Sequence, residues 1–261
     1  MNNRKSIWLI TAVMILALVG CSKKAEETTT ETPTETTTAP PPTPIDQTTV
    51  GEVTGKISFD GAKPKQQRIM MDQDPVCVQK HSGAVFAEDG EVNDNGTLPN
   101  AFVYVKAGAE KYTFAAPSDV VTLDQDGCMY KPHVLGVMTG QTLKIVSSDA
   151  TTHTIHPMPK NNMEWNMSQA PGAAPIEKKF ARPEIMLPVK CNQHPWMRAW
   201  IGVTSNPFFA VSGSDGTFSI KGLPPGDYTI GAWTATFGTQ EQKVTVGAKA
   251  SKTVDLKFKA S

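Results

Sequence analysis

The feature that most constrains the fold is a succession of short apolar or alternating runs from Val50 to the C-terminus. Examples are GEVTGKISF, QTLKIVS, AWIGVT and DYTIGAW, and Gly, Pro, Asn and Asp residues separate the runs. β-branched and aromatic residues at this spacing are typical of strands, and DQDG (124–127) and SDGT (214–217) are typical of turns. No helix of ordinary length is indicated after Val50, and residues 158–175 predict a long loop. The sequence therefore predicts an all-β sandwich fold.

The first twenty residues have the pattern of a secretory signal. Arg4 and Lys5 precede the apolar run IWLITAVMILALVG, which is too short to be a typical membrane span. The run ends in LVGC, a tetrapeptide that resembles the bacterial lipobox, in which the cysteine becomes lipidated and forms the new N-terminus. We therefore expect residues 1–20 to be a lipoprotein signal peptide, and Cys21 to carry the lipid that anchors the protein to a membrane.

Residues 21–49 have the composition of a tether. They are rich in Thr, Glu and Pro and contain almost no large apolar side chain, so they cannot offset the entropy lost on ordering. Their prolines favour extended conformations. We expect this segment to hold the folded part of the chain away from a membrane.

The charge and the motifs exclude two classes of function. The chain has 25 basic and 25 acidic residues, a formal net charge of zero, whereas a nucleic-acid partner would favour a basic face. It also has no Ser-His-Asp arrangement, no phosphate-binding Gly loop and no recognisable pair of catalytic acids. We expect neither a nucleic-acid partner nor an enzyme.

Two separated segments resemble one family of small sandwiches. GEVTGKISFDG (51–61) and LPNAFVYVK (98–106) resemble the opening strands of a carboxypeptidase regulatory-like, or prealbumin-like, domain. SDGTFSIKGLPPGDYTIGAW (214–233) resembles the closing strands of the same family. The resemblance implies one regulatory-like β-sandwich, formed by residues 50–116 together with residues 206–261.

The segment between these two parts resembles a cupredoxin, a Greek-key β-sandwich that binds copper. YKPHVLGVMTGQTLKIVSSDATTHTIH (130–156) resembles the strands and loop that carry the first histidine, and CNQHPWM (191–197) resembles the C-terminal ligand loop. The resemblance implies a cupredoxin-like domain over residues 117–205. It also implies one mononuclear type 1-like copper, with a thiolate, two imidazoles and a weak thioether as ligands. The implied ligands are His153, Cys191, His194 and Met197.

Two residues near this ligand set, His156 and Trp196, have open roles. His156 competes with His153, but residues three apart on a strand face opposite sides, so only one of the two is expected in the site. We choose His153 because it directly follows the loop SSDATT. We then expect His156 either to contact the ligands without binding the metal or to lie at the surface. The interval from His194 to Met197 is shorter than in plastocyanin-like loops, so Trp196 could instead occupy the axial side.

The remaining cysteines give a second structural prediction. If Cys21 is lipidated, three cysteines remain outside the cytoplasm, where thiols tend to pair. Cys77 and Cys128 lie in the turn-like contexts DPVC and DQDGC, and we expect them to form a disulfide. The alternative is a zinc site that adds His81 and His133, but CVQKH and CMYKPH lack the usual close ligand spacing.

The leading functional hypothesis is a lipid-anchored cupredoxin that carries single electrons between unidentified redox partner proteins. Its expected location is the cell envelope, facing the periplasm or at the cell surface. The outer membrane is favoured because Ser22 is not the acidic residue of an inner-membrane retention signal. The alternative is a non-redox lipoprotein of the same fold, either a binding or assembly module or a copper store.

Overall fold

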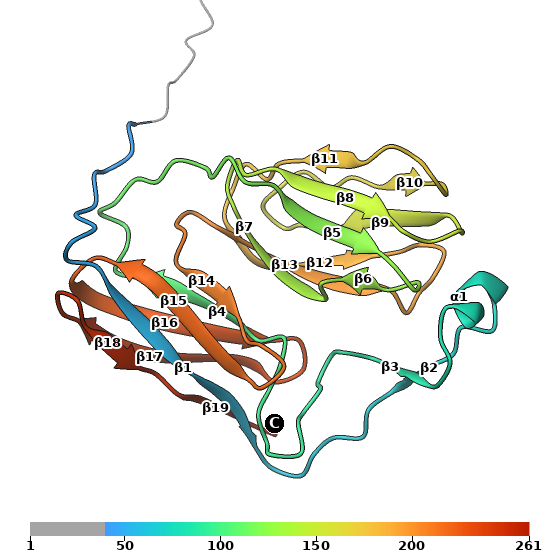
Figure 1. The fold of residues 1–261 in the computed structure, drawn as a ribbon, viewed down its shortest axis with the longest axis horizontal. Coiled ribbons are helices and arrows are strands. Elements are labelled where there is room, and N and C mark those ends of the chain that lie inside the picture. The colour runs from blue at the N-terminus through green and yellow to red at the C-terminus, as the bar shows by residue number, and fades with distance from the viewer. Residues whose placement is uncertain (1–39, 261) are drawn as a thin grey trace, which may run out of the picture. The chain divides into compact units, whose positions relative to one another are not determined.

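The computed structural model describes residues 40–260. The predicted signal peptide, the lipidation site Cys21 and most of the tether therefore lie outside the described residues. Residues 40–260 form 19 strands and a single short helix, and the predicted all-β fold class is confirmed (Figure 1). No helix within 40–260 is long and apolar enough to span a membrane.

The first β-sandwich is formed by the two ends of the described chain. One sheet has the order β15-β1-β18, and β19 also pairs with β1. Its strands are β1 (Gly51–Asp60), β15 (Thr217–Leu223), β18 (Ser251–Thr253) and β19 (Leu256–Lys259). The other sheet has the order β14-β4-β16-β17. Its strands are β4 (Phe102–Ala107), β14 (Phe209–Val211), β16 (Gly226–Thr234) and β17 (Gly238–Val246).

The second β-sandwich uses strands that all lie between residues 121 and 204. A five-stranded sheet has the order β10-β9-β12-β13-β7, with β7 (Val134–Met138), β9 (His153–Pro157), β10 (Met167–Gln169), β12 (Glu184–Lys190) and β13 (Arg198–Thr204). A four-stranded sheet has the order β11-β8-β5-β6, with β5 (Val121–Gln125), β6 (Tyr130–Lys131), β8 (Leu143–Ser147) and β11 (Ile176–Lys178). β7 and β13 pair in parallel, as do β5 and β8.

Alternating burial along these strands produces one core in each sandwich. On β1, Val53, Ile57 and Phe59 face the first core while the residues between them are more exposed. On β9, His153 and Ile155 are buried while Thr154 and His156 are partly exposed. This alternation is the signature of strands with one face on a core, and it orients the first candidate ligand inward.

A third apolar cluster joins the two sandwiches. Phe102 and Phe209 of the first sandwich pack there with Val134 of the second. An added Cβ at Gly202 of β13 would lie 2.2 Å from the Phe102 ring, and one at Gly136 of β7 would lie 2.3 Å from the Phe209 ring. The two glycines therefore let the aromatic rings lie directly on the backbone of the second sandwich.

Between β1 and β4 the chain makes a long excursion that carries β2 (Arg68–Ile69), α1 (Pro75–Gln79) and β3 (Val85–Phe86) (Figure 1). β2 and β3 pair only with each other. α1 begins at Pro75, the first helical residue, and the Asp74 side chain caps its first turn. This combination favours the start of a helix.

Two segments differ in part from the sequence interpretation. Residues 158–175 are not entirely loop, because β10 pairs with β9, and the Gln125 side-chain N–H donates to the buried side-chain oxygen of Gln169 on β10 at 2.7 Å. A three-residue edge strand is too short to produce a period that the sequence reveals. The end of the predicted tether contacts the first sandwich: the amide of Thr43 donates to the Thr113 carbonyl at 2.8 Å, and Ile45 packs on the core.

Candidate metal centre

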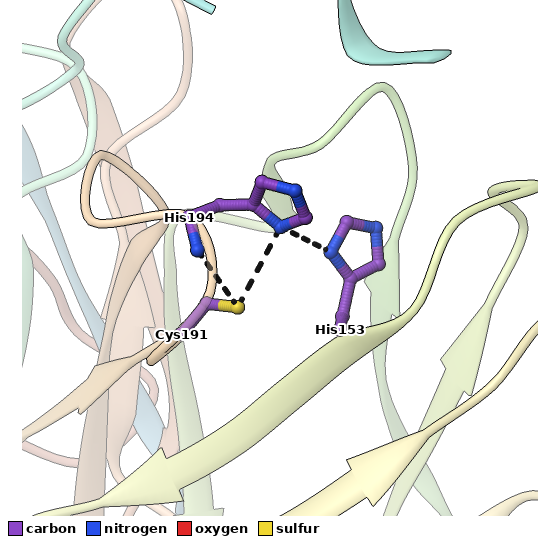
Figure 2. Close-up of side chains that lie close together, drawn as sticks. All are labelled: His153, Cys191 and His194. Carbon is purple, nitrogen blue, oxygen red and sulfur yellow. Dashed lines mark hydrogen bonds between the residues drawn. The ribbon is translucent and has the colours of Figure 1, made fainter. Parts of the chain in front are cut away.

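Three potential metal-ligating side chains meet at one end of the second sandwich. His153 begins β9, Cys191 directly follows β12, and His194 lies in the loop between β12 and β13. Figure 2 shows the His194 ring between the other two side chains. Its Nδ1 lies 2.9 Å from Nδ1 of His153 and 3.7 Å from Sγ of Cys191. All three residues are buried, with 0–4% of their surface exposed, so the donor atoms lie away from bulk water.

Strand pairing and a tight loop put Cys191 in this place. Lys190 of β12 pairs with His156 of β9 in antiparallel register, so Cys191 falls opposite Ile155 and next to Thr154, one residue further along β9. The loop closes through two backbone hydrogen bonds, from the Cys191 amide to the Met197 carbonyl and from the Met197 amide to the His194 carbonyl. The Sγ of Cys191 then accepts from the amides of Thr154 at 3.3 Å and His194 at 3.4 Å.

These contacts favour the thiolate form of Cys191. Burial alone raises the pKa of the thiol, but hydrogen bonds from His153 and Thr154 outweigh burial and lower the pKa to about 6. Burial lowers the pKa of His153, while hydrogen bonds with Asp149 and Cys191 outweigh it and raise the pKa to about 9. Because the thiolate is the form of cysteine that binds metals, these contacts favour ligation by Cys191, whereas His153 must release its Nδ1 proton when a metal binds.

A buried carboxylate fixes the His153 ring. The Nε2–H of His153 donates to Oδ2 of Asp149 at 2.9 Å, and the amides of Gly127 and Cys128 also donate to Asp149 at 2.8 and 2.7 Å. Burial raises the pKa of Asp149, but these hydrogen bonds, with the one from Lys80, outweigh it and hold the pKa well below its usual range. Metal-binding histidines commonly donate their second ring N–H to a carboxylate in this way.

A second carboxylate contacts His194. The Nε2–H of His194 donates to Oδ2 of Asp74 at 3.1 Å. The sequence interpretation missed both Asp74 and Asp149. Asp149 lies in the loop just before His153, but nothing in the sequence of DQDPVC indicates that Asp74 reaches a loop 120 residues away.

The structure separates the other candidates by position. Met197 is fully buried in the same core cluster as Cys191. The Trp196 ring lies 5.1 Å from the His194 ring, centroid to centroid, and its indole N–H donates to the Cys128 carbonyl at 3.0 Å. His156 faces away from the three donors, with its ring nitrogens on Asn192 and Glu164. Strand alternation accounts for the opposite directions of His153 and His156.

Cys77 and Cys128 form the predicted disulfide, with their Cα atoms 5.5 Å apart. The two thiols of the alternative zinc set are therefore bonded to each other and are not available as zinc ligands. The two histidines of that set are also engaged elsewhere: His81 hydrogen-bonds the Gly127 carbonyl at 2.7 Å, and His133 donates to Asp89 at 2.8 Å.

The three donors fit a metal ion by type, and their ligand atoms lie within 4.8 Å of one another. An ion about 2.0 Å from each nitrogen and about 2.3 Å from the sulfur holds the nitrogens roughly 3.3 Å apart and the sulfur roughly 3.6 Å from each nitrogen. The observed separations involving His194 are 2.9 Å from Nδ1 of His153 and 3.7 Å from Sγ of Cys191. One thiolate with two imidazoles is the donor set of trigonal copper centres that transfer electrons.

The comparisons with known proteins concern two parts of the chain. The model of the carboxypeptidase regulatory-like domain family matches residues 199–259, which confirms that resemblance for the C-terminal part. The copper-containing nitrite reductase (NirK) from Thermus scotoductus SA-01 is similar in structure at 19% identity over 39% of this chain, with a TM-score of 0.31. This chain covers 25% of that nitrite reductase chain.

Two smaller solved structures align over almost their whole length. A purple cupredoxin from Nitrosopumilus maritimus aligns at 19% identity over 32% of this chain and 99% of its own, with a TM-score of 0.28. The oxidised P96G mutant of amicyanin aligns at 17% identity over 39% of this chain and 97% of its own, with a TM-score of 0.30. No curated protein matches the sequence.

Proposed function

We propose that the protein binds one copper ion through His153, Cys191 and His194, and that it carries single electrons between redox partner proteins. The observation that carries this proposal is that one thiol and two imidazoles lie buried within reach of one another. One imidazole comes from β9, and the other imidazole and the thiol come from the β12–β13 loop. Bound copper would supply a one-electron couple. The proposal extends to Met197, which is buried in the same cluster and would serve as the weak axial ligand.

The protein's own contribution is to fix the orientation of these donors and to keep them away from bulk water. Two backbone amides fix the sulfur of Cys191, and a carboxylate on the far nitrogen of each imidazole fixes its orientation. Donors that are fixed in advance need little rearrangement when the charge of the centre changes. The arrangement therefore suits transfer of an electron better than binding and release of a substrate, and we propose no enzymatic activity.

Trp196 is the proposed point of contact with redox partners. Its ring packs on His194 and also lines a cavity of about 350 Å³ together with Met129, Pro195 and Arg198. An electron leaving the centre through His194 would meet this partly exposed indole first. Charged groups beside it, among them Glu88 and Arg198, would orient an incoming partner.

The location in the cell is proposed from the sequence. The lipobox-like LVGC, with Cys21 as the lipidated residue, supports a lipid anchor in the cell envelope with the sandwiches facing the periplasm, preferably at the outer membrane, or at the cell surface. The Thr-, Glu- and Pro-rich segment that follows would give the copper centre reach to partners on another surface.

The visible spectrum of copper-loaded protein tests the proposal. The oxidised protein is expected to show an intense thiolate-to-Cu(II) band that disappears on reduction and returns on oxidation. Cys191→Ser and His153→Ala should abolish the band. His156→Ala is the matched control, because this histidine lies on the same strand and faces away, and it should keep the band. A parent protein without such a band, or a Cys191→Ser variant that retains it, would refute the proposal.

A second candidate is a copper-binding or assembly module without electron transfer. The regulatory-like match over residues 199–259 favours it, because such domains are small sandwiches with structural or binding roles. Cyclic voltammetry distinguishes the two. A reversible one-electron wave from the loaded protein supports an electron carrier, whereas bound copper without a reversible wave supports the second candidate.

A further inference from the structure

The excursion between β1 and β4 contributes to the candidate centre although it leaves and rejoins the other sandwich (Figure 1). We call residues 71–81 the cap segment; it contains α1 and the disulfide cysteine Cys77. The cap segment brings Oδ2 of Asp74 to 3.1 Å from Nε2 of His194. His194 therefore has its Nδ1 toward the other donors and its Nε2 toward a carboxylate from a distant part of the chain.

The cap segment is attached firmly to the loops around the donors. The disulfide joins Cys77 to Cys128, whose own amide donates to the Asp149 carboxylate that holds His153. Lys80 reaches Asp149 at 3.1 Å. His81 hydrogen-bonds the carbonyl of the residue before Cys128, at 2.7 Å. The disulfide thus links the segment that carries Asp74 to the turn whose amides, at Gly127 and Cys128, hold the Asp149 carboxylate.

Asp74 itself has little freedom to turn away. Its Oδ1 accepts from the Val76 amide at 2.8 Å and caps α1, and its Oδ2 also accepts from the Thr151 hydroxyl at 2.7 Å. The His194 side chain is 6% exposed and that of Asp74 is 18% exposed. A hydrogen bond between groups held this way and partly shielded from water is stronger than one at the surface.

We propose that Asp74 is a positioning residue of the metal centre: it fixes the tautomer and orientation of His194 from outside the ligand-bearing sandwich. The inference rests on the proposed metal site. By accepting the Nε2–H, Asp74 leaves the Nδ1 lone pair directed toward Cys191 and His153, which is the arrangement a metal needs. The negative charge of Asp74 also makes the imidazole a better donor, and the better donor favours Cu(II) over Cu(I).

The expected effect is one on affinity and on potential. Removing a carboxylate that orients a ligating histidine costs about 10- to 100-fold in metal affinity. Because the affinity for Cu(II) depends on the charge of the ligands more than the affinity for Cu(I) does, we expect the larger loss of affinity for Cu(II). Each tenfold difference between the two losses raises the reduction potential by about 59 mV for a one-electron couple.

Asp74→Asn tests the inference, with Asp72→Asn as its matched control. Asparagine caps helices as well as aspartate does, so the variant keeps α1 while it removes the charge and replaces the oxygen that accepts from His194 with an NH2 donor. Asp72 is exposed in the same cap segment and has no hydrogen-bond partner among the described residues. Asp74→Ser is a second variant, since serine can cap α1 but is too short to reach His194.

Three measurements are made on each variant: Zn(II) and Cu(II) affinity by competition with a chelator, the reduction potential of the copper form, and the ¹⁵N chemical shifts of the His194 ring in the metal-free protein. We expect weaker Zn(II) and Cu(II) binding and a raised potential for Asp74→Asn and Asp74→Ser. We also expect loss of the single Nε2–H tautomer. Asp72→Asn should match the parent in all three.

The outcomes separate this inference from the proposed function. Asp74 variants that bind Zn(II) like Asp72→Asn and keep the parent's His194 tautomer would overturn the inference, whatever copper does. A parent that binds Zn(II) but shows no thiolate-to-Cu(II) band would refute the proposed electron carrier. In that case the zinc affinity and the ring tautomer would still decide the role of Asp74.

Discussion

The disulfide between Cys77 and Cys128 gives a prediction whose size follows from the chain. The two cysteines are separated by 51 residues. Closing a loop of this length removes conformational entropy from the unfolded chain worth about 4 kcal/mol at 25 °C. Both side chains are fully buried, and replacing both with alanine removes only the sulfur atoms. We therefore expect the double variant Cys77→Ala/Cys128→Ala to unfold with a free energy lower by about 4 kcal/mol, which corresponds to roughly 8–16 °C in melting temperature.

Urea unfolding of the metal-free protein, followed by tryptophan fluorescence, measures this difference. The parent protein unfolded in the presence of a reductant is the internal control, because its midpoint should fall to that of the double variant, while the double variant itself should not respond to reductant. A double variant within about 1 kcal/mol of the oxidised parent would refute the reasoning. It would mean that the unfolded chain is already restricted without the bond.

Three other outcomes are expected. Gly202→Ala should lower the free energy of unfolding by about 1–3 kcal/mol in urea titrations, because its Cβ would lie 2.2 Å from the Phe102 ring; a neutral effect would show that the two sandwiches separate easily. Burial lowers the pKa of His133, but its hydrogen bond to Asp89 and the negative charges of Glu88 and Asp89 together outweigh burial and raise the pKa above its usual value of 6.5. The stabilisation by His133 should therefore be complete below about pH 6.5 and decline as the pH rises through the raised pKa. The difference in unfolding free energy between the parent and His133→Gln should shrink from pH 6 to pH 9, and a difference that grows over this range would contradict the assignment. Finally, Cys21→Ala should abolish incorporation of labelled fatty acid in a bacterial host, and continued labelling would place the anchor elsewhere.

The strands were largely accessible from sequence because alternation is a local signal, and the side chains of the candidate centre were accessible through the resemblance to a family. Alternating runs such as GEVTGKISF predicted β1, and the period of two on β9 separated His153 from His156. The CNQHPWM loop resembles a cupredoxin ligand loop, and this resemblance grouped Cys191 and His194 with His153 as candidate ligands. The structure places these three side chains within reach of one another. Their binding of copper, and the axial role of Met197, stay predictions.

Other features carried weak signals or none. The strand β10 was missed because three residues at a sheet edge have no detectable period. The sequence alone did not exclude the zinc alternative. The disulfide between Cys77 and Cys128 excludes it, and only the folded chain shows that these cysteines lie side by side.

The sequence by itself determined the all-β class, since strand alternation depends on residues that are close along the chain, and the set of candidate donors came from the family resemblance. The tertiary structure alone decided how those donors are held. Asp149 and Asp74 contact His153 and His194 through space, and the cap segment that carries Asp74 belongs to an excursion from the other sandwich. No sequence period or spacing encodes such contacts, because they arise from the packing of segments that lie far apart in the sequence.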